Sequence, residues 1–379
     1  MYRILAINPG STSTKVAVFE DEREILSANV QHDPAVLQSF SDVQDQLPYR
    51  RQVVEAALRQ QGVDLGTIDI FVGRGGGVVS VKSGAYAVTP RLLQDARKGM
   101  AGQHPAQLAS QICDLYVQQY GGLAYIVNPP DVDEYQEIAR VSGLADLPRG
   151  SRMHALNQKE VALRYCAAQG IDYHRVNLII AHLGGGISVA AHRHGAMIDG
   201  TDIIRGEGPM TPNRAGALAT LDLVKLCFSG KYTEQQVKDR LSRRGGLMEH
   251  LGTDDARVVE ARIAAGDAYA KVVYEAMAYQ IAKCIGACAV VLSGAVAGII
   301  LTGGLAHSQY LTGFIRDHVG WIAPVEIMAG EFEMEALASG ALRVARGEET
   351  ARDYDGVPVW TGFTPPADNS TNATDLGKE

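Results

Sequence analysis

The sequence lacks the signatures of a secreted, membrane-bound or nucleic-acid-binding protein. Its five cysteines are odd in number and contain no C-x-x-C pair, so we expect reduced thiols in a cytoplasmic protein. The first residues have neither a long apolar region nor an A-x-A site, and they predict a strand in place of a signal peptide. The net charge is −8 and no block of Lys or Arg occurs, which makes nucleic acid a poor partner.

One uncharged run, residues 284–301, is long enough to raise the question of a membrane span. Three glycines interrupt it, and its Ala- and Cys-rich first half differs from its β-like second half. We therefore expect a buried helix followed by a buried strand, and no membrane as a partner.

What is present is the composition of a soluble α/β enzyme. With 379 residues, of which 46% are hydrophobic and 41 are glycine, the chain is too long for one ordinary core and favours two domains that share a cleft.

Two polar turns, each between apolar stretches, suggest that the domains are related. Residues 2–20 predict a hairpin around a Ser/Thr-rich turn, and residues 177–198 repeat the plan around three glycines. Helical spacing occurs at 50–61, 103–120, 155–169, 217–229 and 257–285, so the class is α/β. We expect domains at 1–150 and 151–332, a last helix at about 333–348 that could pack back on the first domain, and a disordered tail at 363–379.

Three Gly-rich turns after apolar strands indicate phosphate binding, although neither G-x-x-x-x-G-K-[ST] nor G-x-G-x-x-G occurs. Backbone N–H groups and hydroxyls of such turns can form an anion nest. The candidates are residues 8–15, with Lys15 as a cation, residues 184–186 and residues 302–305.

The order of short motifs along the chain resembles the acetate/butyrate kinase family, and its butyrate kinase branch most. The resemblance covers roughly residues 2–350 and is carried by NPGSTSTK at 8–15, GRGGG at 73–77, HALNQK at 154–159, HLGGG at 182–186, GEGP at 206–209 and IILTGG at 299–304. It implies two duplicated actin/hexokinase-like (ribonuclease H-like) domains with an ATP cleft between them, ATP/ADP and Mg²⁺ as cofactors, and a homodimer.

The resemblance also implies site residues, position by position. Catalytic roles fall to Arg74, Arg214 and His154. The ATP and phosphate site is matched by Asn8, Ser11, Ser13, Lys15, His182, Gly184, Gly185, Gly186, Gly303 and Gly304. The pocket for the acid comprises Arg74, Val78, Val79 and His104, the two valines being chosen because small residues beside the arginine leave room for a propyl chain. Glu335 matches the glutamate that supports Mg²⁺.

One position departs from the family pattern. Asn128 stands where the family has an aspartate, and an amide brings no negative charge to Mg²⁺. Asp131 or Asp133 could take over, metal binding could be weaker, or the alignment could be shifted at this point.

The expected reaction is the phosphorylation of butanoate by ATP. A carboxylate is ionised at neutral pH and needs no general base, but its charge must be cancelled near the γ-phosphate. Isobutanoate or acetate remain alternative substrates. A hydroxyl or sugar kinase with a carboxylate base, and a nucleotide-switched ATPase with no metabolic substrate, remain alternative functions.

Overall fold

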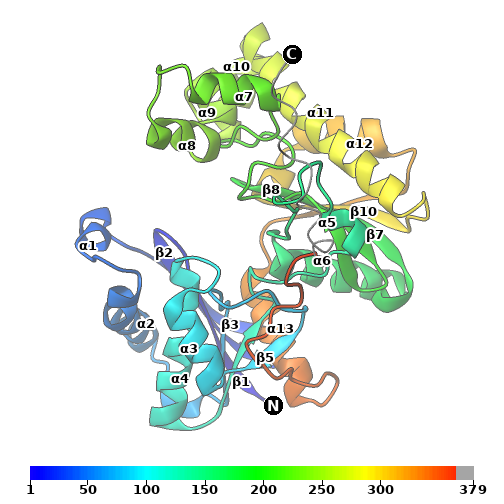
Figure 1. Ribbon diagram of the computed structural model, residues 1–379. Helices are drawn as coiled ribbons and strands as arrows, with labels where there is room; N and C mark the ends of the chain where they lie inside the picture. The colour runs from blue at the N-terminus through cyan, green and yellow to red at the C-terminus, as the bar shows by residue number, and fades with distance from the viewer. Residues whose placement is uncertain (364–379) are drawn as a thin grey trace, which may run out of the picture.

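The computed structural model describes residues 1–363 and consists of two α/β halves, each built on one sheet (Figure 1). The first sheet has the order β3-β2-β1-β4-β6-β5 and the second the order β11-β10-β7-β8-β9. The first half contains β1 (Arg3–Pro9), β2 (Ser13–Glu20), β3 (Arg23–Gln31), β4 (Ile70–Gly73), β5 (Ala85–Ala87), β6 (Leu123–Val127), α1 (Pro34–Gln38), α2 (Leu47–Gln60), α3 (Pro90–Lys98), α4 (Leu108–Tyr120) and α5 (Glu137–Arg140).

The second half follows and then returns to the first. It contains α6 (Ala155–Gln169), β7 (Asn177–Leu183), β8 (Ile187–Arg193), β9 (Ala196–Gly200), α7 (Thr220–Cys227), α8 (Glu234–Ser242), α9 (Gly246–Leu251), α10 (Ala256–Ala264), α11 (Ala268–Val291), β10 (Gly298–Gly303), α12 (Gln309–Val319) and β11 (Val325–Ala329). The last helix is α13 (Glu333–Ala345).

The two sheets repeat one topology. In the first, β1 pairs antiparallel with β2 and parallel with β4. In the second, β7 pairs antiparallel with β8 and parallel with β10. The two predicted hairpins are therefore confirmed, and each places its polar turn at the carboxyl end of a buried strand, where α/β folds bind ligands.

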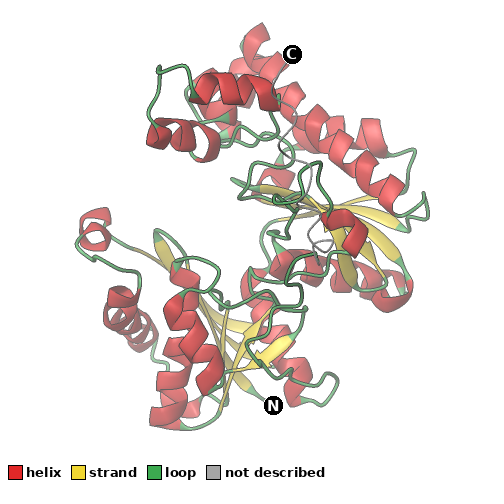
Figure 2. Ribbon diagram, in the orientation of Figure 1, coloured by secondary structure: helices red, strands yellow, loops and turns green. Residues whose placement is uncertain are grey.

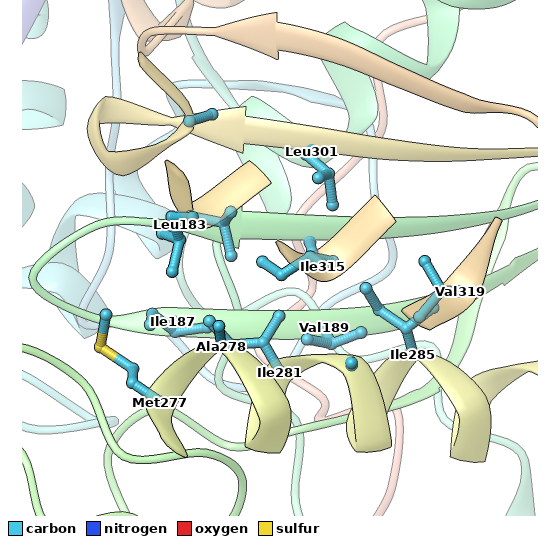
Figure 3. Close-up of a cluster of buried hydrophobic side chains, with 14 of the residues drawn as sticks. Leu183, Ile187, Val189, Met277, Ala278, Ile281, Ile285, Leu301, Ile315 and Val319 are labelled. Carbon is cyan, nitrogen blue, oxygen red and sulfur yellow. The ribbon is translucent and has the colours of Figure 1, made fainter. Parts of the chain in front are cut away.

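Helices cover the faces of both sheets (Figure 2). In the second half, Met277, Ile281 and Ile285 recur every four residues along α11 and pack against the sheet with Val189 and Leu301 (Figure 3). This spacing places them on one face of the helix. The resulting core holds the β7–β8 turn in position.

The last helix, α13, leaves the second half and packs on the first sheet (Figure 1). Leu337 and Ala341 lie in one buried cluster with Ile4 and Val72. The approach is close, since a Cβ at Gly340 would lie 2.6 Å from Val127 Cγ1. The start of α13 is thereby held between the two halves.

One predicted helix proved to be two. The pattern at 257–285 corresponds to α10 and α11, which Gly266 separates with a φ of +93°, a conformation that glycine adopts without steric cost. Helix α6 has the predicted bounds. No helix within residues 1–363 is long and apolar enough to cross a membrane.

We propose the loop near residue 150, which precedes α6, as the boundary between the two domains. The tail expected to be disordered comprises residues 363–379, of which all but the first lie outside the described part of the chain.

Candidate active site

The turns of the two hairpins meet at one cavity of about 250 Å³. In the β1–β2 turn, the Gly10 N–H donates to the Ser13 carbonyl at 2.8 Å, and in the β7–β8 turn the Gly184 N–H donates to the Gly186 carbonyl at 3.1 Å. The cavity is lined by Asn8, Gly10, Ser13, Lys15, Arg74, His154, His182, Gly185, Gly186, Glu331 and Glu333.

Arg74 reaches the cavity from the end of β4. Its backbone N–H donates to the Ile7 carbonyl at 3.2 Å, and its Nη1 lies 3.3 Å from Glu333 Oε1. The glycine that follows allows this path, because Gly75 has a φ of +67° and a Cβ there would lie 2.8 Å from Ile126. The tight turn therefore points the guanidinium of Arg74 toward the cavity.

Glu333 is the acidic residue at the centre of this site. Asn8 Nδ2 donates to its Oε2 at 2.7 Å. Burial alone would raise its pKa, but the charges of Arg74 and Lys15 and the hydrogen bond from Asn8 lower the pKa of Glu333 below its usual range. Glu333 therefore carries a negative charge between the two hairpin turns.

Glu335, the predicted glutamate, does not line the cavity. Two residues along a helix turn a side chain by about 200°, so it faces away from Glu333. It lies instead near Glu24 on β3, where it helps burial to raise the pKa of Glu24.

His154 and His182 stack face to face at the cavity wall. Their ring centroids are 3.8 Å apart and their planes are inclined by 14°. Burial, then His182, Arg74 and Arg214, lower the pKa of His154 well below its ordinary value. Burial likewise lowers the pKa of His182 to about 4. Both imidazoles are thus neutral at pH 7.

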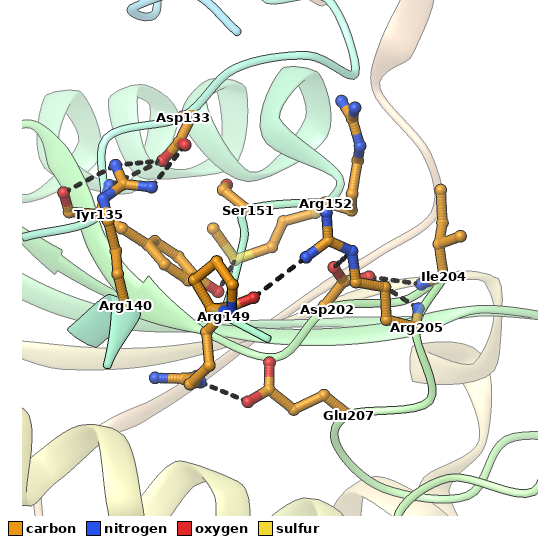
Figure 4. A network of polar contacts seen from close by, with 12 residues as sticks. Asp133, Tyr135, Arg140, Arg149, Ser151, Arg152, Asp202, Ile204, Arg205 and Glu207 are labelled. Carbon is orange, nitrogen blue, oxygen red and sulfur yellow. Dashed lines mark hydrogen bonds and ion pairs between the residues drawn. The ribbon is translucent and has the colours of Figure 1, made fainter. Parts of the chain in front are cut away.

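Arg214 lies on the other side of the β7–β8 turn. A Cβ on Gly186 would lie 2.7 Å from Arg214 Nη1, and the same Nη1 donates to the Ile203 carbonyl at 2.7 Å. Arg214 lines an adjoining cavity of about 1150 Å³. Asp202 orders the loop that carries this carbonyl by accepting from the N–H groups of Ile204 and Arg205 (Figure 4).

The two valines predicted for the acid pocket do not line either of these cavities. Val78 is fully buried in a core cluster with Leu92 and Ile126. The Val79 N–H donates to the Tyr354 hydroxyl at 3.2 Å. The prediction was wrong because the glycine turn points these side chains into the core of the first half.

His104 lies at the edge of the site without lining the small cavity. Its Nδ1 accepts from the Ala106 N–H at 3.1 Å and caps a short helical turn. Although much of the ring is exposed, burial of the remainder and the charges of Arg74 and Arg50 lower the pKa of His104 to about 4.

The three predicted metal candidates near β6 do not line the cavity either. Asn128 Oδ1 accepts from the Gly84 N–H at 2.8 Å. Asp131 pairs with Arg152 at 2.7 Å, and Asp133 forms a two-point ion pair with Arg140 (Figure 4). Both oxygens of Asp133 are bound by Arg140. Asp131 keeps an unpaired Oδ2 among the described residues, but it does not line the cavity between the two turns.

Four remaining predicted residues, Ser11, Gly184, Gly303 and Gly304, lie outside the cavity lining. Ser11 is exposed at the tip of the β1–β2 turn. Gly303 and Gly304 follow β10, where Gly303 has a φ of +89° and a Cβ would lie 2.4 Å from the Leu183 carbonyl oxygen. This third turn is therefore packed against the second one.

Glu331 and Glu333 were not predicted from the sequence, and neither were three polar residues next to the histidines, Asn157, Gln158 and Ser188. The alternating Glu-Phe-Glu-Met-Glu pattern at 331–335 offers three glutamates, and the spacing alone does not say which of them faces a ligand. Asn157 contacts His182, Ser188 contacts His154, and Gln158 contacts Ser188. Asn157 and Gln158 lie inside the HALNQK motif.

Comparison with solved structures shows the fold. The chain superposes on the crystal structure of an acetate kinase from Porphyromonas gingivalis with a TM-score of 0.74, at 18% identity, covering 91% of this chain and 100% of the other. A propionate kinase from Francisella tularensis gives 0.70 at 16% identity, covering 90% and 99%. The protein thus has the actin/hexokinase-like fold of these kinases.

Comparison of sequences shows the family. The model of the acetokinase family matches residues 153–319. Butyrate kinase 2 of Clostridium acetobutylicum is 45% identical over 353 residues, which are 93% of this chain and 99% of the relative. The probable butyrate kinase 2 of Caldanaerobacter subterraneus is 47% identical over 93% of this chain and 100% of the relative. The chain belongs to the acetokinase family.

Proposed function

We propose that the protein transfers the γ-phosphoryl group of ATP directly to the carboxylate of butanoate, which gives butanoyl phosphate and ADP. The observation that carries the proposal is the presence of Arg74, His154 and Lys15 around one cavity beside two anion-binding turns. The relatives named butyrate kinase, at 45% and 47% identity, support the choice of acid.

The charges of the site suit a reaction between two anions. Butanoate is ionised at neutral pH, because an ordinary carboxyl group has a pKa of about 4. The barrier is then the repulsion between the carboxylate and the γ-phosphate, and cationic or N–H donors around the transferred group lower it. Arg74, Arg214 and His154 are the donors that we assign to the equatorial oxygens, while Lys15 and the Gly-rich turns bind the remaining phosphates.

The residues present also fit Mg²⁺, which commonly binds one or two carboxylates together with phosphate oxygens and waters. Glu331 and Glu333 line the cavity, and Asn8 Oδ1 is a buried oxygen with no hydrogen-bond partner among the described residues. Such an orphaned acceptor suits a metal-bound water. We assign the metal-supporting role to Glu333, and Mg²⁺ would neutralise part of the charge of the phosphates.

A hydroxyl or sugar kinase fits the site less well. That chemistry needs a free carboxylate base beside the acceptor hydroxyl. Glu333 is held by Asn8 and Arg74, and Asp131 and Asp133 are bound to arginines away from the cavity. A nucleotide-switched ATPase would have no use for Arg74 and Arg214 facing an acceptor.

We also propose a cytoplasmic homodimer. All five cysteines are free, in keeping with a reducing compartment. Apolar side chains are exposed on two helices of the second half: on α7, Leu221 is 76% exposed, and on α11, Val272 is 63% and Tyr279 is 51% exposed. Exposed apolar side chains of this size on helix surfaces are found at interfaces with a second copy.

The test is to trap the acyl phosphate with hydroxylamine over a panel of acetate, propanoate, butanoate, isobutanoate and several sugars. We expect hydroxamate from the acids, with butanoate favoured over acetate by at least about tenfold in kcat/KM, because each methylene contributes to binding. Preference for acetate would reassign the substrate. ATP hydrolysis without hydroxamate from any acid would overturn the proposal.

A further inference from the structure

Two adjacent amides on α6 are connected to the stacked histidines, Asn157 directly to His182 and Gln158 through Ser188 to His154. Asn157 Nδ2 lies 2.9 Å from His182 Nδ1. Gln158 Nε2 lies 2.8 Å from Ser188 Oγ, which in turn lies 2.8 Å from His154 Nδ1. Asn157, Gln158 and Ser188 are all buried, so these contacts are shielded from water and their donor and acceptor roles can be worked out.

The orientation of Gln158 follows from a carbonyl group. Its Nε2 also lies 3.2 Å from the Ser188 carbonyl oxygen, which only accepts, so this end of the amide is the NH₂ group. Its Oε1 must then accept from His192 Nε2, which is 3.0 Å away. His192 Nδ1 is left as an acceptor for the Tyr173 hydroxyl at 2.7 Å.

The hydrogen bonds continue from Gln158 through Ser188 to His154 at the cavity. Ser188 Oγ accepts from Gln158 Nε2 and from the backbone N–H of His154, at 2.8 and 3.4 Å. These two bonds occupy both acceptor positions of the hydroxyl, so its own hydrogen is donated to His154 Nδ1. The remaining proton of His154 must sit on Nε2. The chain from Tyr173 through His192, Gln158 and Ser188 is thus polarised in one direction and ends in an N–H group at the cavity.

A second chain gives His182 the same tautomer. The Phe332 N–H, which only donates, points to Asn157 Oδ1 at 2.9 Å, so the other end of the amide is the NH₂ group. Asn157 Nδ2 then donates to His182 Nδ1 and to Thr302 Oγ1, at 2.9 and 3.2 Å. The proton of His182 therefore also sits on Nε2.

We propose that Asn157, Gln158 and Ser188 are positioning residues that hold His154 and His182 as a stacked pair of neutral Nε2–H donors facing the transferred phosphoryl group. Within the described residues, neither Nε2 has a hydrogen-bond partner. The assignment of the acceptor rests on the proposed function, whereas the tautomers follow from the hydrogen bonds alone. Hydrogen bonds aligned head to tail strengthen one another in a shielded site.

The buried groups along the longer chain keep the protonation states that this direction requires. Burial raises the pKa of Tyr173 well above its ordinary value, so the hydroxyl remains a donor. Burial also lowers the pKa of His192 to about 3, so its Nδ1 remains an acceptor. In the reverse direction, His192 would carry its proton on Nδ1 and the Ser188 hydroxyl would have to donate to Gln158 Nε2. That nitrogen belongs to an NH₂ group and cannot accept a hydrogen bond.

The first test is a long-range nitrogen–proton correlation spectrum of the isotope-labelled protein, with His154→Asn, His182→Asn and His192→Asn variants for assignment. We expect all three imidazoles to be neutral with the proton on Nε2. A proton on Nδ1 of His154 or His182 in the wild type would overturn the proposal. This readout does not depend on the acceptor, so a failure of the proposed function leaves it interpretable.

The second test is kinetic. Ser188→Ala removes the hydroxyl that fixes His154, and we expect kcat to fall about tenfold or more, with little change in KM for ATP and a mixed tautomer at His154 but not at His182. Ser188→Thr keeps the hydroxyl and should restore most of kcat. Ser110→Ala is the matched control, because Ser110 is also fully buried but donates only to the Gln107 carbonyl on the first half.

Unchanged kcat and an unchanged His154 signal in Ser188→Ala would also overturn the proposal. Where that variant does not fold, Tyr173→Phe deletes a single oxygen at the far end of the chain. We then expect His192 to keep its proton on Nε2, because Gln158 Oε1 still accepts from it, while the signal of its Nδ1, which loses the Tyr173 donor, shifts. A His192 signal identical to that of the wild type would contradict the chain.

Discussion

Asn8 Nδ2 donates to Glu333 Oε2 at 2.7 Å, and this hydrogen bond joins two residues that are 325 positions apart in the chain. It links the end of β1 to the start of α13, so the β1–β2 turn and the acidic residue beside it are held as one unit. The same carboxylate lies 3.3 Å from Arg74.

Glu333→Gln tests the importance of this carboxylate. The change keeps the shape but removes the charge, so we expect kcat to fall about 10- to 100-fold and the Mg²⁺ requirement to rise. Glu335→Gln is the matched control two residues away and should leave both close to wild type. If the two substitutions change the Mg²⁺ dependence of kcat equally, Glu333 is not the residue that supports Mg²⁺.

Arg74→Ala and Arg214→Ala should each lower kcat on the order of 10²–10³-fold, because each removes a charged donor to the transferred group. ATP binding, measured by calorimetry, should weaken far less. Arg175→Ala removes an arginine whose side chain is 85% exposed and serves as the control. Near-wild-type kcat in either active-site variant would remove that arginine from the mechanism.

Gly246→Ala should destabilise the loop that carries Arg214. Gly246 has a φ of +59°, and a Cβ there would lie 1.7 Å from the Thr211 carbonyl oxygen and 2.8 Å from that of Arg214. The left-handed conformation alone costs an alanine roughly 1–2 kcal/mol, and the overlap adds to this cost. We expect a lower denaturation midpoint and a lower kcat.

The control for this strain is Gly252→Ala. Gly252 has a φ of +73°, but its Cβ would meet no atom within 4 Å. It should therefore show only the cost of the conformation, about 1–2 kcal/mol, and unchanged kcat. If Gly246→Ala and Gly252→Ala lower the denaturation midpoint by the same amount, the backbone near Thr211 relaxes to accept the Cβ at no additional free-energy cost.

The buried ion pair of Glu134 and Lys159, at 2.6 Å, should make stability depend on pH. Burial alone would raise the pKa of Glu134, but Lys159 and the hydrogen bonds of Ser83 and Met197 lower it to about 2. Because the folded pKa lies below the unfolded value, the stabilisation is complete above about pH 4.5 and is lost as the pH falls toward 2.

The size of this effect is bounded from above. A shift from 4.5 to about 2 corresponds to about 3 kcal/mol, but burial lowers the pKa of Lys159 despite its partner, so the net gain is smaller. Urea unfolding of wild type and Glu134→Gln between pH 3 and 7 measures it. A variant with the same pH slope as wild type would show that other carboxylates dominate acid unfolding.

Much of the fold followed from local patterns. The two hairpins and α6 were predictable because alternating apolar residues and a helical apolar spacing each describe one element at a time. The split between α10 and α11 was not predictable, because a helix can contain a single glycine and the pattern alone does not show that Gly266 ends one helix. In the site, Asn8, Lys15, Arg74 and His154 were implied by the family resemblance, and they line one cavity.

The sequence by itself therefore determined the class of the fold, the family and the turns that form the site. Only the tertiary structure decided that Glu333, and not Glu335, faces the cavity, because the packing of α13 on the first sheet sets the rotation of that helix. It also decided that Val78 lies in the core, that Asn157 contacts His182, and that Ser188 contacts His154. These are contacts between segments distant in sequence, and no local spacing encodes which side of an element will be buried against which neighbour.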